Sequence, residues 1–252
     1  MGRRGIPSAG PSGQACVRVG SRSMSQDQQM AGGEGRRSEP LFHAPWPSLL
    51  LAALIVLSYA LQSTILTAPD ALQPYWFAPR DLAEGRYAGL VTSLFLHGSW
   101  AHALVNAGFA LAFGAPVARL FGLGPRGAAG FFLFYLVSGG LANLGFAALP
   151  HRVDDVLVGA SGAVSGLAGA AARLMGRRDP DRLAPFFGPA VVSMTAAWFT
   201  SNLLIGLFGV TVFSGGAPIA WQAHIAGYVA GLLLIGPVTR VFGLLPRSDI
   251  SV

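Results

Sequence analysis

A serine between two glycines and a distant histidine are the residues of this chain best suited to nucleophilic catalysis. Ser161 follows Gly159-Ala160 and precedes Gly162, and His224 lies 63 residues further on. A serine hydroxyl attacks poorly until a base removes its proton, and histidine is the usual base near neutral pH. Each residue also has an ordinary structural reading. A serine among small apolar residues often bonds between helices, and a buried histidine often bonds a carbonyl.

His102 and Asn106 are a second pair with chemical potential. They are four residues apart, so they share a face of a helix. Both donate hydrogen bonds without needing a net charge, and such donors stabilise the oxyanion of a tetrahedral intermediate. His97 lies five residues before His102, so we expect it to face elsewhere and to order the preceding loop.

The chain offers few other partners for this chemistry. No Asp or Glu lies inside an apolar span, so the predicted chemistry is a Ser–His dyad. Asp154 and Asp155 lie just upstream of Ser161, and we do not expect either to orient His224. A metal site formed by the three histidines 97, 102 and 224 lacks an acidic or cysteine ligand, so we expect no metal.

The composition is that of a polytopic membrane protein. Of 252 residues, 52% are hydrophobic and only 11% are charged, and the mean hydropathy is +0.53. Soluble domains carry about 25% charged residues. The net charge of +6 comes from arginines that fall mainly at the ends of apolar spans, which argues against nucleic-acid binding. The single cysteine, Cys16, excludes an intrachain disulfide.

Six apolar spans are predicted, each near the roughly 20 residues that cross a bilayer core. They cover residues 46–66, 94–121, 128–149, 157–175, 185–210 and 218–241. We expect a membrane domain at 41–245, a disordered cytoplasmic tail at 1–40 with Met24 as an alternative start, and a short cytoplasmic tail at 246–252. The connection 67–93 is too long for a simple loop, and we expect part of it to lie in the membrane interface.

Arginine placement predicts the orientation of these spans. One side of the predicted membrane carries Arg36, Arg37, Arg119, Arg126, Arg173, Arg177, Arg178, Arg182, Arg240 and Arg247. The other side has only Arg80, Arg86 and Arg152, offset by acidic residues. Because cytoplasmic loops are enriched in arginine, both termini are predicted to be cytoplasmic.

This orientation brings the candidate residues to one depth. Spans two, four and six all run from outside to inside, and His102, Ser161 and His224 each come early in one of them. Polar groups within spans are costly and are functional hypotheses by default. Ser165 shares a face with Ser161 but lies about 6 Å deeper, farther from the water that deacylation needs. Ser161 is therefore the predicted nucleophile.

Three segments resemble the signature segments of the rhomboid family of intramembrane serine proteases. They are Leu96-His97-Gly98-Ser99-Trp100-Ala101-His102-Ala103-Leu104-Val105-Asn106, Gly159-Ala160-Ser161-Gly162 and Ala223-His224-Ile225-Ala226-Gly227. Their order and the six spans agree with the family, and the resemblance covers residues 46–241.

The resemblance implies an all-α bundle of six transmembrane helices, of bacterial type and in the inner (plasma) membrane. It implies Ser161 as nucleophile, His224 as general base, and His102 with Asn106 as oxyanion support, without a cofactor. The implied partners are single-pass membrane proteins, cleaved near the outer face, and the lipid bilayer.

Two positions depart from the family pattern. Many members carry Trp-Arg shortly before the second span, where this chain has Ala88-Gly89, so the anchoring of the first loop is open. Many also carry an aromatic residue four positions after the nucleophile, where this chain has Ser165.

Two other classes of function were weighed against the protease. A catalytically silent relative that binds transmembrane helices has no need to keep both Ser161 and His224. A solute transporter is disfavoured because the spans carry no buried carboxylate or arginine along a pathway. Substrate identity, physiological pathway and oligomeric state are not predicted.

Overall fold

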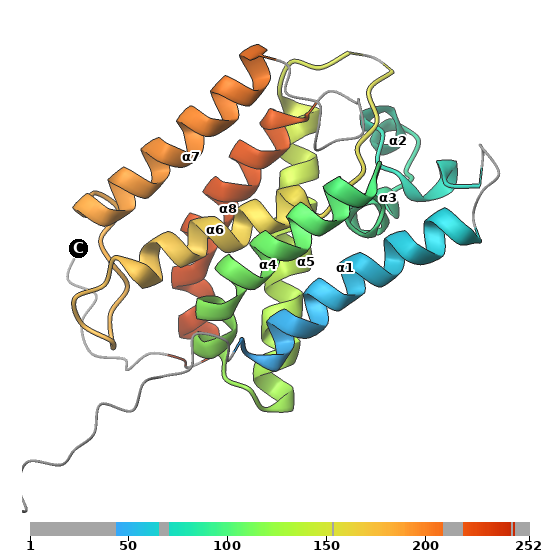
Figure 1. Ribbon diagram of the computed structural model, residues 1–252. Coiled ribbons are helices and arrows are strands. Elements are labelled where there is room, and N and C mark those ends of the chain that lie inside the picture. The colour runs from blue at the N-terminus through green and yellow to red at the C-terminus, as the bar shows by residue number, and fades with distance from the viewer. Residues whose placement is uncertain (1–43, 66–70, 153, 209–218, 243, 245–252) are drawn as a thin grey trace, which may run out of the picture. The chain divides into compact units, whose positions relative to one another are not determined.

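The architecture is all-helical in the computed structural model, which describes residues 44–65, 71–152, 154–208, 219–242 and 244 (Figure 1). These residues belong to one compact unit, His43–Val252. Six long helices follow one another: α1 (Trp46–Thr64), α4 (Trp100–Phe121), α5 (Pro125–Ala148), α6 (Ser161–Met175), α7 (Pro189–Phe208) and α8 (Trp221–Val241). The predictions for the tails at 1–40 and 246–252 lie outside the described residues.

Each predicted span overlaps one of these helices, so the six-helix prediction is confirmed, although α5 begins at Pro125, before its span. The helices begin later than the spans where other structure precedes them. Residues 93–99 form a 3-10 turn and a loop before α4, and the Ser99 hydroxyl accepts the N–H of His102 at 3.1 Å to cap that helix. Apolarity alone does not distinguish such a buried loop from the helix that follows it.

Helix α6 is the centre of the bundle. Almost all of its residues from Gly162 to Leu174 are buried, and it packs on α4, α5, α7 and most extensively on α8. Figure 1 shows α6 between the other helices, with α1 and α7 at opposite sides of it. A helix surrounded in this way needs small side chains, which is what its Gly- and Ala-rich sequence supplies.

Helix α6 is also short. Within the described part of the chain, four helices (α1, α4, α5 and α8) are long and apolar enough to cross a membrane, and α7 is apolar over Pro189–Ile205. With 15 residues, α6 is about 22 Å long, against a hydrocarbon core of about 30 Å. The expectation that every span approaches 20 residues was therefore wrong for α6, because the chain before Ser161 is not helical.

The loop between α1 and α4 is tied to the bundle at several points. It contains η2 (Gln73–Tyr75), α2 (Pro79–Ala83), α3 (Gly89–Thr92) and η3 (Ser93–Phe95). Buried Phe77 forms an isolated antiparallel bridge with Leu157, with backbone bonds of 3.1 and 2.7 Å.

A buried asparagine of α5 adds a second anchor. Asn143 Nδ2 donates to Leu90 O at 3.1 Å and to Ser93 Oγ at 3.0 Å. Arg86 pairs with Asp81 and Glu84 inside the loop. The chain thus fixes this loop without the Trp-Arg pair.

Candidate active site

Ser161 is the first residue of α6, not one turn inside it as the span 157–175 implied. Gly159, at φ +130°, turns the chain into the helix in a conformation that side chains rarely adopt. The first helical hydrogen bond runs from Val164 N–H to Ala160 O at 2.9 Å. The N–H groups of residues 161–163 therefore have no carbonyl partner within the helix. The Ser161 hydroxyl lies beside these donors, at the positive end of the helix dipole.

His102 faces the same space as the Ser161 hydroxyl. A Cβ built on Gly159 would lie 2.9 Å from His102 Nε2 and 3.7 Å from Ser161 Oγ. Nδ1 of His102 accepts the N–H of Gly98 at 3.4 Å, so the proton of the neutral ring is on Nε2. The atom that faces the space beside Gly159 is thus a hydrogen-bond donor.

Asn106 lies one turn further along α4 and is buried. Its Nδ2 donates to the carbonyl oxygen of His102 at 2.9 Å. An amide nitrogen carries two hydrogens, so this bond leaves one for a second acceptor. The Asn106 side chain is therefore fixed by a bond within α4, and its second Nδ2–H remains able to donate to another acceptor.

His224 lies at the level of Ser161 on the neighbouring helix. A Cβ built on Gly162 would lie 3.7 Å from Ala223 O, so the first turns of α6 and α8 face each other. Ser161 and His224 are the chain neighbours of these two contacting residues. The fold therefore places the predicted nucleophile, base and oxyanion residues at the adjacent starts of α6, α8 and α4.

Asn202 of α7 is a partner of His224 that sequence reasoning missed. Its Oδ1 lies 2.7 Å from Nδ1 of the His224 ring, and its Nδ2 donates to Trp198 O at 2.8 Å. The signal was present, because Asn202 is a buried amide in a span that is otherwise largely apolar.

The expectation that His97 faces away from His102 was wrong. The two rings meet edge to face with centroids 5.1 Å apart, and Ala160 N lies 3.5 Å from His97 Nε2. Helical periodicity does not apply, because α4 begins only at Trp100. His97 thus contacts both the candidate oxyanion donor and the backbone just before Ser161.

Gln62 of α1 holds His97 in this place. Its Nε2 donates to His97 O at 2.7 Å, and its Oε1 accepts His97 N–H at 3.0 Å. Burial, reinforced by neighbouring His102, lowers the pKa of His97 to about 3 in the loop that precedes α4. The ring is therefore neutral near pH 7.

Ser165 is engaged elsewhere. It is buried, and its hydroxyl donates to the carbonyl oxygen of Ser161 at 2.7 Å. This bond within α6 uses the hydroxyl proton that a nucleophile would have to give to a base.

The two acidic residues nearest to Ser161 in the sequence have partners other than His224. Asp154 lies 3.7 Å from exposed Arg80, and Asp155 accepts the N–H of Arg152 at 2.8 Å. Within the described residues, no group of three or more His, Cys, Asp or Glu side chains is placed to hold a metal ion.

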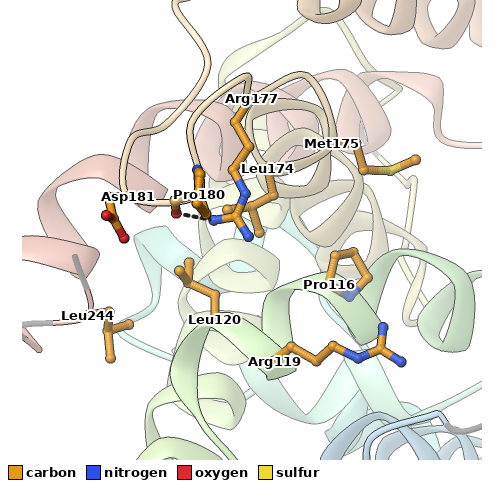
Figure 2. Close-up of a pocket in the computed structure, with 9 residues that line it drawn as sticks. All are labelled: Pro116, Arg119, Leu120, Leu174, Met175, Arg177, Pro180, Asp181 and Leu244. Carbon is orange, nitrogen blue, oxygen red and sulfur yellow. Dashed lines mark hydrogen bonds between the residues drawn. The ribbon is translucent and has the colours of Figure 1, made fainter. Parts of the chain in front are cut away.

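A surface pocket of about 350 Å³ lies at the other end of α6. Figure 2 shows Leu174 and Met175 of that end beside Arg119 of α4 and Arg177, whose Nη1 donates to Pro180 O at 2.8 Å. Ser161 is about 20 Å away along the helix axis. The pocket is therefore separate from the candidate active site.

Comparison with known proteins places most of the chain in one family. The family model of the rhomboid domain matches residues 84–240, more than half of the chain. This range includes all four predicted site residues as well as Asn202 and His97. A search of curated proteins found no significant match.

Proposed function

Because the chain belongs to the rhomboid family, we propose that this multi-pass membrane protein is an intramembrane serine endopeptidase. It cleaves transmembrane helices of single-pass membrane proteins near the outer face of the membrane. Its partners are these substrates and the lipid bilayer, and it needs no metal, cofactor or nucleic acid.

One observation carries the proposal. The Nε2–H of His102 and the Ser161 hydroxyl both lie beside Gly159, where a Cβ would be 2.9 Å from His102 Nε2 and 3.7 Å from Ser161 Oγ. A serine that only packs between helices does not need a hydrogen-bond donor next to it at Gly159. A serine nucleophile needs one, because the carbonyl that it attacks becomes an oxyanion.

Each of these residues has a role in the proposed reaction. Ser161 Oγ attacks the scissile carbonyl, and His224 takes its proton. The oxyanion receives hydrogen bonds from His102 Nε2–H, from Asn106 Nδ2–H and from the amides at the start of α6. His224 then gives its proton to the leaving amine, and water hydrolyses the acyl-enzyme with His224 again as base.

The shortness of α6 supports this chemistry. A helix of about 22 Å does not span a 30 Å core, so Ser161 at its start lies below one face of the membrane, within reach of water from that side. The starts of α4, α6 and α8 lie together, and the arginine pattern places this end on the outer side. Deacylation therefore has a route for its water.

The first test is labelling of the detergent-solubilised protein with a fluorophosphonate, whose phosphoryl oxygen takes the place of the oxyanion. We expect the wild type to be labelled, and His102→Ala or Asn106→Ala to be labelled roughly tenfold more slowly. The effect is smaller than the hundredfold loss of an oxyanion donor in a soluble protease, because backbone amides share the charge.

The double variant His102→Ala/Asn106→Ala separates catalysis from packing. We expect its labelling to be slower than that of either single variant, while full labelling would remove the oxyanion role. A folded wild type that is not labelled at all would instead favour a silent family member that binds transmembrane helices.

The topology is a second expectation. We propose that both termini are cytoplasmic, in a bacterial plasma membrane, with the 67–93 loop outside. A Glu84→Cys variant in a Cys16→Ala background is then labelled by a membrane-impermeant maleimide added to the outside of intact cells. Glu84 is suited to this test because its side chain is half exposed. Labelling only after the cytoplasm is opened would reverse the orientation.

A further inference from the structure

Asn202 contacts the candidate base at the Nδ1 atom of its ring. Its Oδ1 lies 2.7 Å from Nδ1 of His224. We propose that Asn202 is a positioning residue, which holds the His224 imidazole in the tautomer with the proton on Nδ1 and so leaves Nε2 free to accept the serine proton. The inference rests on the proposed function and adds a third member to its Ser–His pair.

The orientation of the Asn202 amide is set by its own helix. Its Nδ2 donates to the carbonyl oxygen of Trp198 at 2.8 Å, one turn earlier in α7. A carbonyl accepts only from the nitrogen end of the amide, so the oxygen end must face His224. An amide oxygen has no proton to give. The short contact therefore requires Nδ1 of His224 to be the donor.

The position of α7 beside α8 is fixed by other contacts. Thr195 Oγ1 and Tyr228 Oη are 2.9 Å apart, and the rings of Trp198 and Tyr228 stack with centroids 5.8 Å apart. Thr195 and Trp198 lie about two turns and one turn of α7 from Asn202, on the same side of the helix. The Asn202 amide therefore contacts His224 from a helix whose position beside α8 is fixed by these contacts.

Two features of this chain make such a partner useful. The spans contain no carboxylate that could orient the base, and Ser165 occupies the place where many family members have an aromatic residue. A neutral amide also avoids placing an uncompensated charge beside a buried imidazole. Soluble cysteine proteases use the same solution in their Cys-His-Asn sites.

The test combines a spectroscopic and a kinetic measurement. In protein labelled with ¹⁵N-histidine, we expect the His224 signals to show Nδ1 protonated and Nε2 bare. The five histidines are distinguished by the signals that disappear in His224→Ala. Asn202→Leu should shift His224 toward the Nε2-protonated form. It should also lower the maximal rate of cleavage by about 10- to 100-fold with little change in KM, as for partners that orient a functional histidine.

Two further variants separate positioning from packing. Asn202→Asp keeps an acceptor oxygen beside Nδ1, and we expect it to restore the wild-type tautomer. Thr195→Val breaks a different hydrogen bond between α7 and α8, and we expect it to keep the wild-type tautomer and a rate within about threefold of wild type.

The outcomes distinguish this inference from the proposed function. A wild-type His224 with its proton on Nε2 overturns the role of Asn202 without any variant. So does an Asn202→Leu protein that keeps the wild-type tautomer or the wild-type rate. A wild type that cleaves nothing and takes no fluorophosphonate overturns the proposed function, while its tautomer still tests the bond to Asn202.

Discussion

Replacing Ser161 by alanine is expected to abolish cleavage of a model transmembrane substrate, whereas Ser165→Ala is expected to retain most of it. Removing the nucleophile of a serine protease costs on the order of a million-fold in rate, which is total loss in such an assay. Ser161 lies at the start of α6 among amide donors, and it shares the space beside Gly159 with His102. The measurement is cleavage by purified protein reconstituted in liposomes.

Ser165 is the matched control, because it has the same side chain in the same helix. Its hydroxyl bonds the carbonyl oxygen of Ser161 at 2.7 Å, so Ser165→Ala removes one intrahelical bond that contributes about 1 kcal/mol. We expect activity within about threefold of wild type, because the backbone of Ser161 stays bonded in α6. Cleavage that survives Ser161→Ala and is lost in Ser165→Ala would move the nucleophile to Ser165.

The close pairing of α6 and α8 was predictable from sequence. Gly162 and Gly166 in one span, and Gly227 and Gly231 in the other, have the spacing of small residues that let membrane helices approach. In the structure these glycines face one another across the interface. Such spacing is readable from sequence because it is a property of the helix itself.

The surroundings of the imidazoles were less predictable. His97 was misplaced because helical periodicity was extended through residues 97–99, which are not helical. Asn202 was overlooked because its bond to His224 depends on how α7 packs against α8. Gln62 escaped attention for the same reason, since it reaches His97 from α1. Contacts between elements depend on packing, which local patterns do not encode.

The first loop shows a related limit. Ala88-Gly89 left its anchoring open, because the expected Trp-Arg pair is missing. The structure anchors the loop through Phe77, paired with Leu157, and through Asn143 of α5. Gly89 itself packs against the backbone of Trp76, where a Cβ would lie 2.5 Å from the carbonyl oxygen. The departure from the family pattern is thus accompanied by a contact that only glycine permits.

The Gly231→Ala variant is expected to lose its folded structure or a large part of its stability. A Cβ on Gly231 would lie 1.8 Å from the carbonyl oxygen of Gly166 and 2.5 Å from its carbonyl carbon. These are backbone atoms in the middle of α6, so no side-chain rotation can make room for the methyl group. The two helices would have to separate along their most extensive contact. We expect a destabilisation of about 3 kcal/mol or more, at the upper end of overpacking effects.

Gly236→Ala in the same helix provides the control. A Cβ there would meet only the ends of Arg173 and Leu183, at 3.7 and 3.9 Å, which are ordinary contacts. Alanine is also the better helix former by up to about 1 kcal/mol. We expect this variant to unfold at or above the wild-type temperature, measured by circular dichroism in detergent. Equal melting temperatures for the two variants would mean that α6 and α8 do not pack at backbone distance. The alignment of Ser161 with His224 would then lose its structural basis, because that same contact holds the two residues at one level.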